Sequence, residues 1–465
     1  MDVMSDVHIV ILAAGKGTRM KSALPKVLHA VAGRPLIEHV IDAASQLSPA
    51  SITVVVGHHA DTVRGALAAR NHVEFVVQEP QLGTAHALLT TEPVLRHATG
   101  TLVMLSGDVP ALSADTLKSL VSVHEQSRAA ATVVTAIVGN PHGYGRIVRR
   151  GEKIARIVEE KDATADERAI TEINSGIYAF DLAGLYDAVR SIGSSNAQRE
   201  YYLPDLVSIY RERERPVETV TVTDSAEILG VNSRMELAVV GRYLRQRKNA
   251  ELMAAGVTIE DPDTTYVDAD VTVGPDTILK PGVSLTSGSS IGSGCVIYSG
   301  SRIAGSTVGD GAVVYDHCVV TDSVIGADAA VGPFAHLRGH AELGRRAKVG
   351  NFVELKKTRL GDGSKSMHLT YLGDAVIGTG VNIGAGTITC NYDGQRKHVT
   401  TIEDGAFIGS DSQLIAPITV GEGAYVGTGT TVRENVPAGS LAVSAGKQRN
   451  IEGWVEQKKR KGNAD

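Results

Sequence analysis

The sequence predicts two folds in one chain: an α/β domain with a Rossmann-like sheet in the first half and an all-β parallel β-helix in the second. In the first half, short apolar runs alternate with helix-length segments, which is typical of a parallel sheet covered by helices. In the second half, aliphatic residues recur every six positions. This period matches neither a helix nor an alternating strand and is the hexapeptide signature of a parallel β-helix.

The apolar runs of the first half predict the strands of its sheet. They are Val7 to Leu12, Ile52 to Val56, Val73 to Val77, Leu102 to Leu105 and Thr132 to Val138. Polar, glycine-containing segments follow strand ends at 13–20, 106–110 and 140–146. Because ligands of parallel sheets bind beyond the carboxyl ends of the strands, we expect these three segments to converge on one crevice.

A helix is predicted between the two halves. Ser233 and Glu236 form a Ser-x-x-Glu capping box, and a helix-compatible stretch runs from Arg234 to Gly256, which can end the helix. We therefore predict a first domain at residues 1–232, a linker helix at 233–256, and a β-helix domain with a C-terminal tail at 257–465.

The aliphatic comb defines the predicted β-helix. Its members are Val267, Val273, Leu279, Leu285, Ile291, Ile297, Ile303, Val308, Val314, Val320, Ile325, Val331, Leu337, Leu343, Val349 and Leu355, and later Ile402, Ile408, Leu414, Val420, Val426 and Val432. Many are followed by glycine, as expected where a turn follows each inward side chain. The C-terminal half is therefore predicted to be a solenoid.

Two breaks interrupt the comb, at 360–371 and 389–402. The first contains His368, and the second contains the run 390–394. We interpret both breaks as extra loops, which cost conformational entropy without extending the core, and so we expect them to have a function.

Composition limits the class of protein. The net charge of −6 gives no reason to expect a nucleic acid or a membrane as a partner. Cys295, Cys318 and Cys390 form neither a disulfide framework nor a metal-ligand spacing, which favours a reducing compartment. The apolar run His8 to Ala14 is too short for a signal peptide or a membrane span. We therefore expect a soluble, cytoplasmic protein.

A glycine loop follows the first predicted strand, at Gly15 to Arg19. Glycines let backbone N–H groups approach phosphate oxygens, and Lys16, Arg19 and Lys26 could neutralise a polyphosphate during phosphoryl-type transfer. A Rossmann dinucleotide loop is the competing interpretation, but its third glycine is missing, and a Walker loop would end in Gly-Lys-Ser/Thr. A plain turn with solvated lysines would explain Gly-x-Gly alone but not the full pattern.

Asp108 is the candidate metal ligand of the first half. It follows a strand that we expect to be buried, where a carboxylate could hold Mg²⁺ against a phosphate. A carboxylate that only stabilises a turn is the alternative.

These motifs resemble those of sugar-1-phosphate nucleotidyltransferases. Together with the hexapeptide half, the chain is similar to the bifunctional bacterial N-acetylglucosamine-1-phosphate uridyltransferase/glucosamine-1-phosphate acetyltransferase family, from about Val7 to Trp454. Further matching segments lie at 78–85, 106–110, 143–147, 158–162, 173–176 and 230–232. The resemblance implies that the β-helix is left-handed.

The resemblance also implies two reactions. The C-terminal domain would acetylate glucosamine-1-phosphate with acetyl-CoA. The N-terminal domain would then transfer the uridylyl group of UTP to N-acetylglucosamine-1-phosphate with Mg²⁺ and release pyrophosphate. A triangular β-helix presents flat faces that closed cyclic symmetry can bury, so we expect a homotrimer with small-molecule substrates as its other partners.

The family pattern assigns residues to the uridylyl site. Arg19 and Lys26 match catalytic residues, while Asp108 and Asn232 match the metal ligands. The nucleotide and sugar contacts match Leu12, Ala13, Ala14, Gly15, Lys26, Gln78, Gly83, Thr84, Ser106, Gly107, Asp108, Gly145, Glu159, Asn174 and Asn232.

The family pattern also assigns the acetyl site. His368 matches the general base, a role that suits an imidazole near neutral pH, although a histidine that is merely hydrogen-bonded on a loop is the alternative. Contacts to the amino-sugar phosphate match Arg338, Lys356, Tyr371 and Asn382, and the acetyl-CoA neighbourhood matches Ala385, Asn391, Tyr392, Ser410, Thr428 and Ala445.

The chain departs from the pattern at two of these coenzyme positions. Many relatives have alanine at Thr428 and an arginine at Ala445, and Lys447 or Arg449 could supply the missing charge.

Two alternatives to the two-site enzyme stay open at this point. The β-helix could serve only oligomerisation or regulation of a nucleotidyltransferase, or it could be a trimeric scaffold that binds a partner protein. His368 together with Asn391 and Tyr392 favours the two-site enzyme.

Overall fold

The computed structural model describes residues 6–444, 446 and 448–462 and divides into two compact units, Met1–Arg247 and Lys248–Asp465. The division falls inside one helix, α9 (Arg234–Ala254). Ala445 and Lys447 lie outside the described residues. The domain limits expected near 232 and 256 stay predictions.

The first unit is built on a nine-stranded sheet with the order β11-β7-β10-β6-β1-β4-β5, and β8 and β9 extend it beside β10. The strands are β1 (Val7–Ala13), β4 (Ser51–Val56), β5 (Val73–Val77), β6 (Thr101–Ser106), β7 (Ala131–Ile137), β8 (Arg146–Arg150), β9 (Lys153–Val158), β10 (Glu172–Asp181) and β11 (Val217–Val222), with β2 (Ala30–Val31) and β3 (Arg34–Pro35) apart. β10 runs antiparallel to β6 and β7, whereas β1 is parallel to β4 and β6. The predicted Rossmann-like sheet is confirmed.

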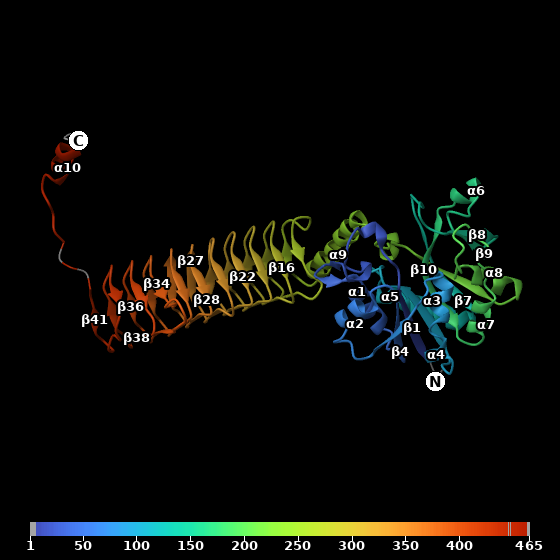
Figure 1. Cartoon of the computed structure of the whole chain (residues 1–465), viewed down its shortest axis with the longest axis horizontal. Helices are drawn as coiled ribbons and strands as arrows, with labels where there is room; N and C mark the ends of the chain where they lie inside the picture. Colours follow the sequence, from blue (N-terminus) through green and yellow to red (C-terminus); the bar gives the residue numbers. More distant parts are fainter. Residues whose placement is uncertain (1–5, 445, 447, 463–465) are drawn as a thin grey trace. The chain divides into compact units, whose positions relative to one another are not determined.

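Helices cover both faces of this sheet (Figure 1). They are α1 (Leu36–Ser45), α2 (Ala60–Ala66), α3 (Thr84–Leu89), α4 (Glu92–Leu95), α5 (Ala114–Ser127), α6 (Ala165–Arg168), α7 (Leu185–Arg190) and α8 (Asp205–Glu212), with 3₁₀ turns at Thr18–Met20, Lys26–Leu28 and Ser225–Ile228. Ile9 and Ile11 pack with α1, α2 and α5, whereas Val10 packs with α3, α7 and α8. β1 is therefore apolar at consecutive positions because both of its faces are buried.

Helix α9 begins at Arg234, as predicted, but its cap differs from the expected box. The Glu236 N–H donates to Ser233 Oγ at 3.2 Å, while the Glu236 carboxylate accepts from the backbone N–H of Asn232 at 2.6 Å. The side chain of Glu236 thus reaches one residue further back than a capping box requires and holds Asn232 in place. Gly256, in the left-handed region at φ 93°, follows the helix end.

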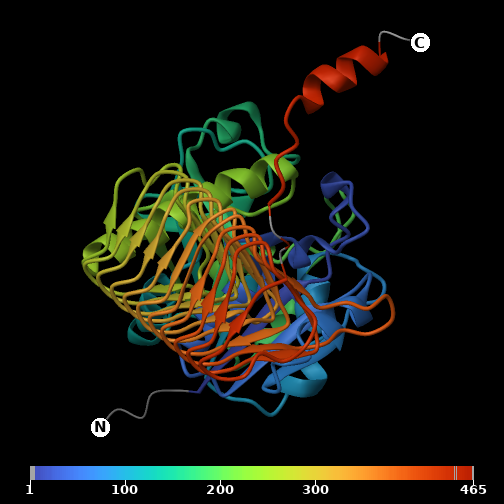
Figure 2. The same ribbon diagram turned by 90° about the vertical axis from the view of Figure 1, so that its left-hand side faces the viewer.

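The second unit is a three-sided stack of parallel strands (Figures 1 and 2). The first sheet contains β12 (Thr258–Ile259), β15 (Ile278–Leu279), β18 (Val296–Ile297), β21 (Val313–Val314), β24 (Ala330–Val331), β27 (Lys348–Asn351), β30 (Lys365–His368), β33 (Asn382–Ile383), β36 (Phe407–Ile408), β39 (Tyr425–Val426) and β41 (Leu441–Ala442). The second contains β13 (Tyr266–Val267), β16 (Ser284–Thr286), β19 (Arg302–Ala304), β22 (Val319–Thr321), β25 (His336–Arg338), β28 (Glu354–Lys356), β31 (Tyr371–Gly373), β34 (Ile388–Cys390), β37 (Gln413–Ile415) and β40 (Thr431–Val432). The third contains β14 (Thr272–Val273), β17 (Ser290–Ile291), β20 (Thr307–Val308), β23 (Val324–Ile325), β26 (Glu342–Leu343), β29 (Arg359–Leu360), β32 (Ala375–Ile377), β35 (Thr400–Ile402) and β38 (Ile418–Val420), and a helix, α10 (Trp454–Gly462), follows the stack.

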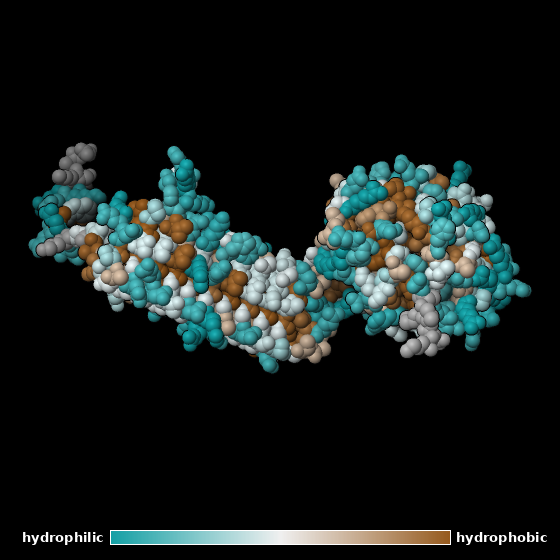
Figure 3. Space-filling view, turned by 90° about the horizontal axis from the view of Figure 1, so that it is seen from below, coloured by the Kyte–Doolittle hydropathy of each residue, from teal (hydrophilic) through white to brown (hydrophobic). Residues whose placement is uncertain are grey.

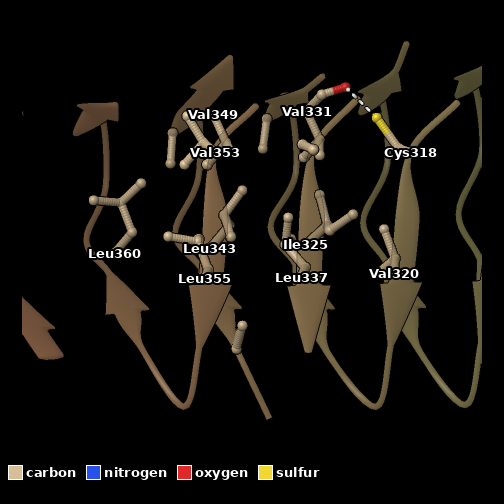
Figure 4. Close-up of a cluster of buried hydrophobic side chains, with 14 of the residues drawn as sticks. Cys318, Val320, Ile325, Val331, Leu337, Leu343, Val349, Val353, Leu355 and Leu360 are labelled. Carbon is tan, nitrogen blue, oxygen red and sulfur yellow. Dashed lines mark hydrogen bonds between the residues drawn. The ribbon is translucent and has the colours of Figure 1, made fainter. Parts of the chain in front are cut away.

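The aliphatic comb forms the core of this stack. Figure 4 shows its members pointing inward in rows, with Leu360, Leu343 and Ile325 side by side from successive strands of the third sheet. The register pairs each inward residue with the inward residue of the next coil, as in Val331 with Val349. The predicted β-helix is confirmed.

The first break in the comb is not a loop, and this expectation was wrong. Residues 365–368 form β30, and its inward residue Ser366 is fully buried between Val349 and Ile383. The strand was not predicted because the pattern counts only aliphatic residues, and its inward residue is a serine. Thr389, 1% exposed, likewise continues the core in the second break, where only residues 391–399 are inserted.

The described helices include none that is long and apolar enough to cross a membrane. Within the same residues, Cys295, Cys318 and Cys390 are free.

Inward and outward positions on one strand should respond differently to the same kind of truncation. Ile325→Ala should lower the free energy of unfolding by about 2–5 kcal/mol because it leaves a cavity in the core. Val324→Ala, the outward neighbour at 46% exposure, should change it by no more than about 0.5 kcal/mol. Urea denaturation of the full chain measures both values. Equal losses would contradict the inward orientation.

Candidate active sites

The carboxyl ends of β1, β4, β5 and β6 surround a pocket of about 850 Å³. Most of the predicted nucleotide residues line it: Leu12, Ala13, Ala14, Gly15, Lys16, Lys26, Gln78, Gly83, Thr84, Ser106 and Asp108. Arg19 is exposed in the 3₁₀ turn Thr18–Met20, and neither it nor Gly107 is among the lining residues. Segments 13–20 and 106–110 therefore meet at this crevice as expected, whereas segment 140–146 contributes only Tyr144, to the adjoining smaller pocket, and Arg19 lies outside the wall.

Two glycines shape this pocket. A side chain at Gly17, whose φ is 58°, would meet Cβ of Lys26 at 2.8 Å, so the loop can close on Lys26 only with glycine here. Gly83, at φ 113°, packs against the backbone of Tyr201 and accepts a hydrogen bond from Gln78 Nε2 at 3.0 Å through its carbonyl. Gly17 thus allows the glycine loop to approach Lys26, and Gly83 allows its loop to approach Tyr201.

The ammonium group of Lys26 lies between the two predicted metal ligands, Asp108 and Asn232. Lys26 forms an ion pair with Asp108, and its Nζ donates to Asn232 Oδ1 at 3.0 Å. Ser106 Oγ donates to the other oxygen of Asp108 at 2.6 Å. The backbone N–H of Val231 donates to the Asp108 carbonyl at 2.9 Å and so brings the Asn232 segment to the strand end.

These donors fit Mg²⁺. A carboxylate oxygen and an amide oxygen are hard ligands, and Mg²⁺ typically takes one or two protein ligands plus substrate phosphate and water. The described residues contain no cluster of three or more His, Cys, Asp and Glu side chains that could hold a metal, so the pair Asp108 and Asn232 is the candidate site.

A smaller pocket of about 230 Å³ adjoins the first and shares Asp108 with it. Glu159 and Asn174 line it, and Gly145 packs against both, because a Cβ there would lie 3.1 Å from the Glu159 carboxylate. Asn174 Oδ1 accepts from the Tyr178 hydroxyl at 2.9 Å, which leaves its NH₂ group to donate into the pocket. Burial, and then the charges of nearby aspartates, raises the pKa of Glu159. This pocket offers both acceptors and donors to a sugar.

In the second unit, strand register places several of the predicted acetyl-site residues in two axial rows. The first row contains Asn351, His368, Ala385, Ser410 and Thr428, one residue per coil. The second contains Arg338, Lys356 and Gly373. The first row precedes the strands of the second sheet in each coil, and the second row lies at the ends of those strands. The two rows therefore lie at opposite ends of one side of the coil.

Asp374, directly after Gly373, connects the second row to the insertion. It accepts from Lys356 Nζ at 3.1 Å and from the side-chain amide of Asn391, so it ties the insertion to the coil. Lys397, also in the insertion, lies next to Lys356. The Lys356 ammonium lowers the pKa of Lys397. Two adjacent cations with one carboxylate indicate an anion site.

Other predicted residues lie around these rows. Arg338 donates from Nε to the Glu354 carboxylate at 2.7 Å. The ring of Tyr371 lies over Gly373, where any side chain would collide with its phenol. Asn382 begins β33, and Tyr392 is exposed on the insertion with its hydroxyl donating to the Gly394 carbonyl at 2.6 Å. Ala445 lies outside the described residues.

The sequence pattern alone missed Asp374, Lys397 and Asn351. All three point outward from the coil or lie in the insertion, where the six-residue period carries no information. The register of neighbouring coils is the signal that finds Asn351 and Asp374, whereas Lys397 is found only from its contact with Lys356.

The chain matches known proteins along nearly its whole length. It is 48% identical to the bifunctional protein GlmU of Pelobacter propionicus over 98% of this chain and 100% of the relative. The relative named bifunctional protein GlmU in Trichlorobacter lovleyi is 49% identical over 97% of this chain and 99% of the relative, and that of Brevibacillus brevis is 47% identical over 99% of each. The chain belongs to the bifunctional GlmU family.

Family models match both units of the chain. Residues 9–173 match the MobA-like NTP transferase domain, residues 262–359 the GMPPB C-terminal domain, and residues 400–434 the bacterial transferase hexapeptide. The resemblance stated from the motifs is confirmed. Like other GlmU proteins, the chain is a nucleotidyltransferase and an acyltransferase in one polypeptide, acting on small-molecule substrates.

The raised pKa of Glu159 predicts a pH-dependent affinity for the sugar phosphate. As the pH falls, this carboxylate takes up a proton at a higher pH than an ordinary glutamate and then loses acceptor capacity. The KM for the sugar phosphate should therefore rise as the pH falls towards this pKa. The substrate phosphate titrates in the same way with Glu159→Gln and with the parent enzyme. The KM of Glu159→Gln should be raised at every pH but should lack the additional rise that protonation of Glu159 causes in the parent enzyme. Parallel pH profiles for the two proteins would contradict the contact.

Proposed function

We propose that the C-terminal unit transfers the acetyl group of acetyl-CoA to glucosamine-1-phosphate and that the N-terminal unit converts the product and UTP to UDP-N-acetylglucosamine with Mg²⁺. The cation site that Lys26, Asp108 and Asn232 form between the two pockets supports the nucleotide half most directly. The free cysteines and the absence of a membrane helix from the described residues suit a cytoplasmic enzyme, where both co-substrates are available.

The two adjoining pockets suit uridylyl transfer. The larger would hold UTP, with Gln78 and Gly83 at the uracil and the glycine loop at the phosphates, and the smaller would hold the sugar phosphate. A phosphate oxygen of the sugar attacks the α-phosphorus, and the bond to pyrophosphate breaks. Mg²⁺ held by Asp108 and Asn232 would neutralise charge on the phosphates. Lys26 and Lys16 supply further positive charge, and the chain contributes mainly positioning. Arg19, exposed beside the loop, would have to swing inward to act.

The acetyl site would use the first row for chemistry and the second for binding. The neutral amine of the sugar attacks the thioester carbonyl, and His368 Nε2 accepts the proton that the amine nitrogen loses. The C–N bond forms, the C–S bond breaks, and coenzyme A leaves as the thiolate. Ala385, Ser410 and Thr428 continue the row from His368 and would lie along the coenzyme, while Lys356 would bind the sugar phosphate.

A second copy of the chain would complete this site. The corner beside His368 carries Phe334, Phe352 and Leu369 at 49%, 56% and 64% exposure, all with positive φ. Bulky residues in the left-handed region each cost about 1–2 kcal/mol. Figure 3 shows hydrophobic surface along this unit. Because the two rows stand at opposite ends of one side, a homotrimer packed on this corner would bring His368 of one chain to Lys356 of the next.

Asp108→Ala should abolish uridylyl transfer and leave acetyl transfer nearly unchanged, because Asp108 lies in the first unit and His368 in the second. Pyrophosphate release and coenzyme A release measure the two reactions on one preparation. Retained Mg²⁺-dependent synthesis of UDP-N-acetylglucosamine would contradict the metal role, and loss of both activities would indicate misfolding.

His368→Ala should lower the turnover of acetyl transfer by about 10²–10⁴-fold, the typical contribution of a general base. The KM for acetyl-CoA should change little, because the imidazole is not expected to hold the coenzyme, and uridylyl transfer from supplied N-acetylglucosamine-1-phosphate should persist. Acetylation at the parent rate across neutral pH would mean that the base lies elsewhere.

A further inference from the structure

His368 is held to the preceding coil by one side chain with no role assigned so far. His368 Nδ1 lies 2.8 Å from Asn351 Oδ1, and the two residues are register partners on β30 and β27. An amide oxygen only accepts, so this contact requires a proton on Nδ1 of a neutral imidazole. Nε2 then carries the lone pair, and it has no protein partner among the described residues.

The backbone of both strands is adapted to this contact. β27 and β30 have four residues each, whereas the other strands of the stack have two or three. A side chain at Gly350 would collide with the carbonyl of Met367, so only glycine lets the two coils approach this closely immediately before the pair. The Thr370 hydroxyl donates to the His368 carbonyl at 2.7 Å and fixes the backbone on the other side.

We propose that Asn351 is a positioning residue that fixes the Nδ1-H tautomer and the ring orientation of His368, so that Nε2 faces the amino group of the substrate. This inference rests on the proposed role of His368 as the base. When the imidazole takes up the proton, both nitrogens become donors, and Asn351 Oδ1 still accepts from Nδ1. The contact therefore serves the ring before and after proton transfer.

The charge of the side chain at position 351 accounts for an amide there. The charged side chains of the same two strands are the register partners Lys348 and Lys365. A carboxylate at position 351 would favour the imidazolium, which cannot accept a proton, whereas the amide orients the ring without adding charge. An acceptor without charge thus keeps the base available at lower pH.

The test compares Asn351→Ala and Asn351→Asp with the parent enzyme and with His368→Ala. For each full-length protein, kcat and KM for acetyl transfer are measured from acid to alkaline pH, and uridylyl transfer on the same preparation serves as the folding control. Asn351→Ala should lower kcat about 10- to 100-fold, as loss of an orienting partner typically does, with little change in KM for acetyl-CoA. Asn351→Asp, which can only accept, should recover most of kcat at alkaline pH, with the acid limb of the profile displaced to higher pH.

The other outcomes are distinguishable. If His368→Ala loses acetyl transfer while Asn351→Ala keeps the kcat and pH profile of the parent, the positioning role is wrong and the proposed function stands. If both Asn351 variants lose activity equally with no displacement of the acid limb, Asn351 does not act as an acceptor, and the tautomer assignment fails. If His368→Ala itself retains full acetyl transfer, the proposed base is wrong, and the inference fails with it.

Discussion

The register between successive coils of the β-helix is the constraint on which the second unit depends. Each inward aliphatic residue packs on the inward residue of the next coil, so the outward residues also fall into axial rows. A row repeats at the spacing between strands, about 4.8 Å. Asn351 thereby meets His368, and Lys356 follows Arg338, without any loop having to position them. Rigid coils in fixed register can hold catalytic side chains more precisely than loops can.

The first unit reaches the same end through its strand ends. Lys26, Asp108 and Asn232 come from three distant parts of the chain, and the hydrogen bonds of Val231 and Glu236 bring the last of these to the sheet. A buried carboxylate is stable there because Lys26 pairs with it. Under the proposed function, Asp108 and Asn232 would hold Mg²⁺ in place of the Lys26 ammonium, and Lys26 would then be available for a phosphate.

The six-residue period predicted the inward, core positions of the second unit but not the outward or inserted residues. Inward positions repeat, so the solenoid could be predicted from the sequence. Apolar runs predicted β1, β4, β5, β6 and β7, and the Ser233 and Glu236 pattern predicted the helix start at Arg234. Ser366 defeated the pattern because a buried serine carries no hydrophobic signal, and the coil around it was mistaken for a loop. Asp374 and Lys397 could not be predicted, because only tertiary contacts, between coils for Asp374 and from the insertion for Lys397, bring them to Lys356. The antiparallel strand β10 likewise depends on pairing that no local run reveals.

We propose that His368 of one chain works with Lys356 of another. Subunit mixing tests it most directly: His368→Ala and Lys356→Ala chains are co-expressed at equal levels, and acetyl transfer by the mixed oligomers is compared with that of each variant alone. If neighbouring chains complete each site in one direction, random mixing restores about a quarter of the sites of the parent enzyme. If both residues of a site come from the same chain, the mixture stays as inactive as the two variants, and the shared site is refuted.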